Sequence, residues 1–180
     1  RYIRRQRQMC IRDRSETLAE SVFKDNFQNS EKWNFVTDQV MGGVSSGNVE
    51  FIPLKNNFVA HITGKISTQN RGGFIQIRRK LNKVNLENSK FINITAKGNN
   101  QKYFIHLRTT GTFLPWQYYQ INFNVNNEFK VFSLPIDAFK SSSSFLSDKI
   151  NPKKITSIGI VAFGRDHIAD LFIKEVSFVN

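Results

Sequence analysis

The chain has 180 residues, of which 39% are hydrophobic and 17 are Phe, so it holds enough apolar material for the core of one domain. Its formal net charge of +12 favours a nucleic-acid or anionic-membrane binding protein at first sight. A single Cys excludes an internal disulfide framework and a cysteine-based zinc cluster, and no apolar run approaches the roughly 18 residues that cross a bilayer.

Much of the positive charge lies at the N-terminus. Residues 1–14, RYIRRQRQMCIRDR, hold six Arg and one Asp, after which the composition changes to a background rich in Lys, Asn, Ile and Phe. The string RQRQMCIRDR is similar to the translation of a sequencing adapter. We therefore interpret residues 1–14 as foreign to a single domain at 15–180, assign Cys10 no function and expect no nucleic-acid partner. The alternatives are a basic arm for RNA or lipid and the remainder of an Arg-rich targeting peptide.

The first elements in chain order are irregular. Residues 16–27, ETLAESVFKDNF, carry no sustained apolar stripe and are predicted to be a peripheral segment, with a short helical start as the alternative. Residues 33–47, WNFVTDQVMGGVSSG, follow a polar turn. The Gly42–Gly43 pair indicates a positive φ, which we expect at Gly43, or a close approach of another segment. Asp38 and Ser45 or Ser46 are suited to accept hydrogen bonds from the N–H groups that such a loop exposes.

After Gly47 the apolar residues recur with a period of two, which predicts strands with one buried face. Pro53 marks an edge or the end of the first such strand, and a second glycine-pair turn is predicted at Gly72–Gly73. Further turn signals recur every 8–15 residues, and no helix is long enough for a βαβ crossover. The pattern predicts an all-β fold, an antiparallel β-sandwich or jelly roll. Its roughly nine strands lie at 48–54, 58–66, 74–81, 90–98, 102–110, 116–125, 129–136, 155–163 and 169–179.

The loop at 33–47 also fits a family signature. Trp-x4-Asp-x2-Met-Gly-Gly-x-Ser-x-Gly, here Trp33 to Gly47, resembles the opening motif of the complex I intermediate-associated protein 30 family. The resemblance extends over residues 27–178 and includes the Gly72–Gly73 turn, KGNNQKYFI at 97–105, Trp116 before a strand and SLPIDAF at 133–139. It implies a galactose-binding-like β-sandwich. It also gives the loop, with its residues Trp33, Asp38, Gly42, Gly43 and Ser45, a structural role.

The sequence shows no constellation for catalysis. The three His share no metal-ligand spacing, and there is no GxSxG elbow, Walker loop or pair of catalytic carboxylates. Asp38 beside a glycine pair has an alternative interpretation as a metal or phosphate loop, but the Lys of a phosphate loop is missing. We therefore predict no enzymatic activity, no cofactor and no metal site.

A candidate binding face emerges from the alternation within three predicted strands. Arg78 alternates with Ile75 and Ile77, and Arg108 with Ile105 and Leu107, so both arginines are predicted to point away from the core and to be replaceable without loss of stability. If their strands are neighbours, polar and aromatic side chains share one outer face. The alternative is that the aromatic members are packing residues with a hydrated polar end. The candidate face comprises Gln76, Arg78, His106, Arg108, Trp116 and Tyr118.

The resemblance implies a non-enzymatic binding domain that assists assembly of respiratory NADH:ubiquinone oxidoreductase through protein contacts. Its partner would be a subunit or assembly intermediate, in the cytoplasm of a bacterium or the mitochondrial matrix of a eukaryote. The alternative function is a carbohydrate-binding module, because the galactose-binding-like fold hosts many of these and the candidate face has aromatic rings beside fork-shaped donors. RNA binding is a third interpretation, which depends on residues 1–14.

Overall fold

A computed structural model describes residues 20–180, and the interpretation of residues 1–14 lies outside this range. Twelve strands are described, connected by turns and five short 3-10 helices. The strands are β1 (Ser21–Asp25), β2 (Trp33–Thr37), β3 (Ser46–Leu54), β4 (Asn57–Ile66), β5 (Phe74–Lys80), β6 (Phe91–Gly98), β7 (Lys102–Thr109), β8 (Tyr119–Asn124), β9 (Lys130–Pro135), β10 (Lys140–Ser141), β11 (Ile155–Phe163) and β12 (His167–Val179).

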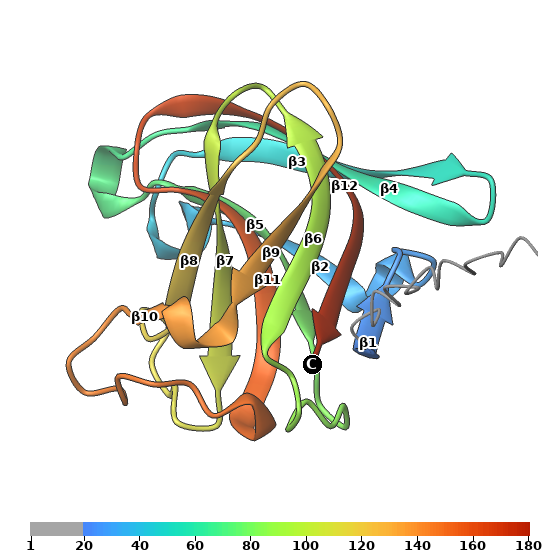
Figure 1. Ribbon diagram of the computed structural model, residues 1–180. Coiled ribbons are helices and arrows are strands. Elements are labelled where there is room, and N and C mark those ends of the chain that lie inside the picture. The colour runs from blue at the N-terminus through green and yellow to red at the C-terminus, as the bar shows by residue number, and fades with distance from the viewer. Residues whose placement is uncertain (1–19) are drawn as a thin grey trace, which may run out of the picture.

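The strands form two antiparallel sheets that pack face to face (Figure 1). Sheet A has the order β3-β4-β12-β6-β9, with β1 paired to the C-terminal part of β12. Sheet B has the order β10-β8-β7-β11-β5-β2. The predicted antiparallel β-sandwich is confirmed, but β1, β2 and β10 were not among the predicted strands. The expected loop at 33–47 begins with a strand, because residues 33–37 pair with β5 as β2 at the end of sheet B. The β3–β4 hairpin projects beyond the sandwich, with β3 at the edge of sheet A and Pro53 near its end, as a proline requires (Figure 1).

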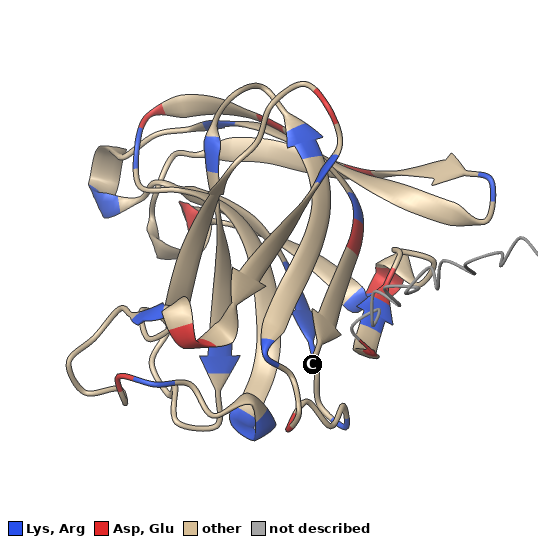
Figure 2. Ribbon diagram, viewed as in Figure 1, with Lys and Arg blue, Asp and Glu red and all other residues tan. Residues whose placement is uncertain are grey.

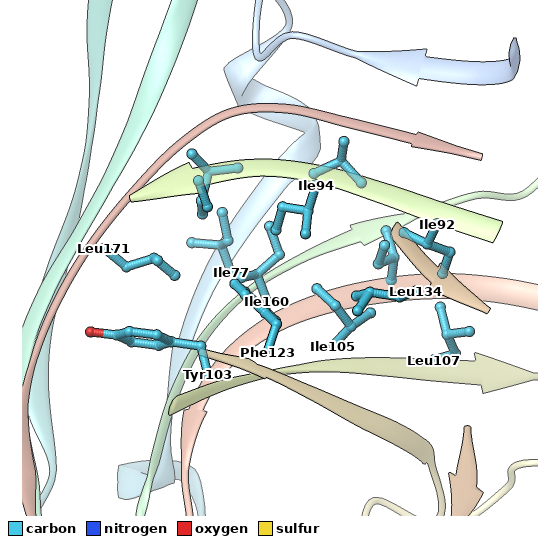
Figure 3. Packing of buried hydrophobic residues seen from close by; sticks show 14 of the residues in the cluster. Ile77, Ile92, Ile94, Tyr103, Ile105, Leu107, Phe123, Leu134, Ile160 and Leu171 are labelled. Carbon is cyan, nitrogen blue, oxygen red and sulfur yellow. The ribbon is translucent and has the colours of Figure 1, made fainter. Parts of the chain in front are cut away.

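The core lies between the two sheets and is built by the predicted alternation. Ile92 and Ile94 of β6 point from sheet A toward Ile105 and Leu107 of β7 in sheet B, and all four side chains are fully buried (Figure 3). Tyr103 is also fully buried, and its hydroxyl accepts from the backbone N–H of Asp170 and donates to the side chain of Asn99. Because each strand turns alternate residues inward, the residues between them face solvent on the outer surface of each sheet.

The peripheral placement of residues 16–27 is wrong for its described part. Residues 21–25 form β1, and Phe27 is completely buried against Trp33. Buried Asp25 explains this placement, because its carboxylate accepts from Trp33 Nε1 at 2.8 Å and forms an ion pair with Arg79 of β5. Arg79 faces the same side as Ile75 and Ile77, and pairing with Asp25 offsets the cost of burying its charge. This cluster ties the first strand to both sheets.

Candidate functional site

The two glycine-pair turns meet at one buried carboxylate, that of Asp38, which is 0% exposed. Its Oδ1 accepts from Ser45 N at 2.9 Å, and its Oδ2 accepts from the Ser45 hydroxyl and from Gly73 N, each at 2.5 Å. Ser45 Oγ in turn accepts from Ser67 N at 3.0 Å. The predicted role of Asp38 and Ser45 as hydrogen-bonding residues of the loop is therefore confirmed.

The glycines allow this close packing, although not for the reason expected at Gly43. Within this pair the positive φ is found at Gly42, at 83°, so the predicted positive φ at Gly43 is wrong. A Cβ on Gly43 would lie 2.3 Å from Cγ of Asp38, and a Cβ on Gly72 would lie 2.3 Å from its Oδ2. Both positions exclude a side chain because the carboxylate fills the space.

This turn also presents two apolar side chains to solvent. Val40 and Met41 follow Asp38 in a short 3-10 helix, and they are 73% and 56% exposed. They form one wall of a cleft of about 670 Å³ on the outer face of sheet B. The buried carboxylate thus positions a wall of the cleft without lining it.

The cleft brings together all six residues of the candidate face, and its further lining comes from β2, β5, β11 and the flanking turns. The lining residues are Val36, Val40, Met41, Arg71, Gly72, Phe74, Gln76, Arg78, His106, Arg108, Pro115, Trp116, Tyr118, Ser157, Gly159, Val161 and Phe163. That these side chains form a binding site stays a prediction.

Strand β11 forms the floor of the cleft because it pairs with β5 on one side and with β7 on the other. Gly159 lies directly between Arg78 and His106 in this register. A Cβ at Gly159 would lie 2.9 Å from Oε1 of Gln76, so the glycine keeps the floor low at this point. Ser157, two residues earlier on β11, pairs with Arg108 and lines the cleft beside it.

His106 is a neutral aromatic part of the floor. Its ring stacks on Tyr118 with centroids 4.1 Å apart and planes 10° from parallel, and Phe163 contacts both rings edge-on. Burial lowers the pKa of His106 from 6.5 to about 4, against a smaller opposing effect of Gln120. The imidazole is therefore uncharged at neutral pH, and it packs with Tyr118 and Phe163 as one aromatic cluster in the lining of the cleft.

Trp116 forms the opposite wall and is 60% exposed. The loop before it is held by Arg108, whose Nη2 donates to the carbonyls of Thr112 and Leu114 at 3.3 and 3.0 Å. The Ser142 hydroxyl donates to the Trp116 carbonyl at 2.7 Å. The Trp116 ring is thus presented to solvent from a backbone that is fixed on both sides.

The charge of the cleft has one sign. Arg71, Arg78 and Arg108 line it, whereas no Asp or Glu does so among residues 20–180. Burial lowers the pKa of Arg108, and the neighbouring charge of Arg78 lowers it further. A smaller hollow of about 220 Å³ adjoins the cleft, shares both of these arginines and adds Lys80.

Several lining residues were not predicted from the sequence. The outward residues of β11 lie in the apolar run ITSIGIVAF, which has no clear alternation. The signal that was available is Ser157 and Gly159 between Thr156, Ile158 and Ile160, which marks a small, partly polar face. Arg71 and Phe74 flank a glycine pair, where alternation gives no direction.

Two other features considered from the sequence, a metal site and a membrane-spanning segment, were also sought in the described residues. Between residues 20 and 180, no three His, Cys, Asp or Glu side chains are grouped so that they could hold a metal ion. No helix in this range is long and apolar enough to cross a membrane. Lys and Arg are scattered over strands and turns of both sheets (Figure 2), so the clustering of arginine in the cleft is local.

Comparison with known families and structures supports both the fold and the resemblance found in the sequence. The model of the family described as Complex I intermediate-associated protein 30 (CIA30) matches residues 22–171. A search of curated protein sequences finds no significant match.

Among solved structures, the chain is similar to carbohydrate-binding modules. The family 11 module of the cellulase Lic26A-Cel5E of Clostridium thermocellum superposes with a TM-score of 0.71 at 10% identity, covering 90% of this chain and 94% of that one. A family 11 module from the same organism, in complex with a β-1,3-1,4-mixed-linked tetrasaccharide, gives 0.69 at 11% identity, with 87% and 93% covered. A family 30 module gives 0.55 at 10% identity, with 91% and 88% covered. At such identities the likeness shows a shared β-sandwich.

Proposed function

The chain belongs to the Complex I intermediate-associated protein 30 family, and we propose that it is a non-enzymatic assembly factor for respiratory NADH:ubiquinone oxidoreductase. In this proposal the sheet B cleft holds a subunit or an assembly intermediate of that enzyme. The domain would act where the enzyme is assembled, in the cytoplasm of a bacterium or in the mitochondrial matrix of a eukaryote.

The observation that carries the proposal is the exposure of apolar side chains on fixed backbone around the cleft. Val40 and Met41 on one wall and Trp116 on the other are each more than half exposed. Large side chains of this kind, next to arginine, are the residues that contribute most to protein interfaces. A cleft with rigid walls also loses less conformational entropy when a partner binds.

The mechanism that follows is reversible shielding. An exposed apolar segment of a subunit binds between the two walls and is kept from aggregating until its final neighbour in the enzyme displaces the assembly factor. Such a cycle needs no nucleotide, because partner exchange depends only on competing affinities.

The test is affinity capture from the source cell with the domain starting at Ser15. Subunits or other assembly factors of the enzyme are expected with the wild-type domain and are expected to be lost with Trp116→Ala. Phe145→Ala is the matched control, because Phe145 is a 91% exposed aromatic residue outside the cleft. The proposal fails if no such component is captured and cells lacking the protein assemble the enzyme at normal levels.

A second candidate is a carbohydrate-binding module. The supporting observation is the stacked pair His106–Tyr118 beside Trp116 on the face of a sandwich similar to modules of this class. A glycan array tests it directly. Binding of a neutral oligosaccharide that is lost in Trp116→Ala and kept in Phe145→Ala would favour this function over assembly.

A further inference from the structure

We infer that the sheet B cleft selects an acidic segment of its protein partner, with an Asp or Glu side chain seated between Arg78 and Arg108 and an apolar neighbour against Trp116 and Tyr118. This inference rests on the proposed function, because it names the chemistry of the partner that the same cleft would take.

The distribution of basic residues is the first observation. The chain after residue 14 holds fifteen Lys and only five Arg. Three of those five Arg line the cleft, and within the described residues no Lys does. A guanidinium offers a planar fork of donors that matches a carboxylate, which an ammonium group does not. The preference for arginine is therefore specific to this cleft and is not explained by the general positive charge.

The second observation is that these charges have no acidic partner in the cleft. Arg79 and Arg165, the two arginines of residues 20–180 that lie outside the cleft, bond to Asp25 and to Gln101, respectively. Arg78 forms no ion pair with any residue of the described chain, and within residues 20–180 the Arg108 guanidinium donates only to Thr112 and Leu114. Arg78 and Arg108 repel each other, and a bound carboxylate would relieve that repulsion.

The third observation distinguishes a peptide from a sugar. Hydroxyl groups of a neutral glycan need acceptors as well as donors, and carboxylates are the strongest acceptors. Among residues 20–180 no carboxylate lines the cleft, so its acceptors are neutral groups such as the Gln76 amide oxygen and the Ser157 hydroxyl. Beside these polar groups and its aromatic rings, the cleft is lined by the aliphatic and thioether side chains of Val36, Val40 and Met41, which suit the apolar side chains of a peptide.

The geometry also gives the order of contacts. Arg78 and Arg108 flank β11 at Gly159 and Ser157, where the floor is lowest. Trp116 and Tyr118 lie on the Arg108 side, and Val40 and Met41 line the cleft from the turn that follows β2. A carboxylate above Gly159 therefore has apolar surface on both sides. The partner segment is expected to carry an acidic residue flanked by apolar ones.

The experiment uses a displayed library of random twelve-residue peptides, selected in parallel on the wild-type domain, Arg78→Glu and Lys130→Gln. Lys130 is an exposed residue at the start of β9 in the other sheet and serves as the charge control. Wild type and Lys130→Gln are expected to enrich peptides with Asp or Glu beside apolar residues. Arg78→Glu is expected to lose that enrichment and to favour Lys or Arg instead.

The most enriched peptide is then synthesised with its acidic residue and with Gln or Asn in its place. Binding is followed by the fluorescence of Trp116, since Trp33, the only other Trp, is buried. We expect the acidic peptide to bind the wild-type domain at least tenfold more tightly than its amide analogue. In Arg78→Gln that difference should shrink below threefold, while the melting temperature stays unchanged.

Several results would overturn the inference. They are a library that enriches no acidic peptides, an amide analogue that binds as well as the acid, and an Arg78→Gln variant that weakens both peptides equally. Tighter binding of a galacturonic acid oligosaccharide or of a single-stranded oligonucleotide would also overturn it. Acid selectivity without capture of respiratory enzyme components would refute the proposed function alone, whereas capture that is insensitive to Arg78→Glu would refute the inference alone.

Discussion

Replacing Asp38 by Asn tests whether one buried carboxylate holds the two glycine-pair turns together. The amide keeps the size and shape of the side chain but presents one NH2 group where the carboxylate presents a second acceptor. In one orientation that group faces Gly73 N and the Ser45 hydroxyl, and in the other it faces Ser45 N. Either way a buried donor is left opposite another donor.

The cost follows from these contacts. A buried donor without a partner costs about 1–3 kcal/mol, and hydrogen bonds to a charged acceptor contribute about 1.5–3 kcal/mol each. Because such values are not additive, we expect Asp38→Asn to lower the free energy of unfolding by about 4 kcal/mol. For a domain of this size that corresponds to a fall in melting temperature of about 8–16 °C.

The assay is urea unfolding followed by far-UV circular dichroism, with a thermal melt as the second measurement. Asp137→Asn is the matched control, since Asp137 is an exposed carboxylate in a 3-10 turn, and it should shift stability by less than about 0.5 kcal/mol. A loss below about 1 kcal/mol in Asp38→Asn would show that the turns are held by something other than this carboxylate.

Three further predictions concern the two Trp residues, His106 and residues 1–14. Trp116→Ala should cost only about 1–2 kcal/mol of stability because the ring is 60% exposed, whereas Trp33→Ala should cost about 3–5 kcal/mol because that ring is 5% exposed; equal losses in urea unfolding would refute this division of roles. The pKa of His106 is about 4 in the folded protein and 6.5 ordinarily, so the unfolded chain binds the proton at a higher pH than the folded one. The contribution of His106 to the free energy of unfolding is therefore fully present above pH 6.5 and falls by roughly 3 kcal/mol toward pH 4. Unfolding of His106→Gln across this range should show a smaller fall, and an identical profile would contradict the assignment. Deleting residues 1–14 should leave the melting temperature unchanged, because every described strand pairing involves residues from Ser21 onward; a lower melting temperature would show that the segment belongs to the domain.

The alternation of apolar and polar residues along single strands predicted which side chains point into the core and which point outward. It placed Ile105 and Leu107 inside and His106 and Arg108 outside, and the structure confirms each direction. These directions depend only on the local geometry of a strand, so they need no knowledge of its neighbours. The same reasoning selected all six members of the candidate face, which the structure places in one cleft, although Trp116 and Tyr118 precede β8 instead of lying in the strand predicted at 116–125.

Which strands are neighbours was not predictable in the same way. The face is continuous because β11 inserts between β5 and β7, although β11 follows β7 in sequence by more than forty residues. Residues on both faces of β11 are largely buried, although one face forms the floor of the cleft, so its sequence is mostly apolar and its outward side is hard to identify. The peripheral placement predicted for residues 21–27 was wrong for a similar reason. The partners that bury Asp25 and Phe27 include Trp33 and Arg79, which is distant in sequence.

The two basic residues at the centre of the cleft, predicted as an equivalent pair, differ in their contacts. The Arg78 guanidinium forms no hydrogen bond with another described residue, while the Arg108 guanidinium donates to the loop that precedes Trp116. Arg108 therefore fixes a wall of the cleft as well as contributing charge, just as Asp38 fixes the wall formed by Val40 and Met41. A substitution at Arg108 would change wall position and charge together, so the expectation that both arginines can be replaced without loss of stability applies to Arg78. Of these two arginines, only Arg78 allows the charge of the cleft to be changed without moving a wall.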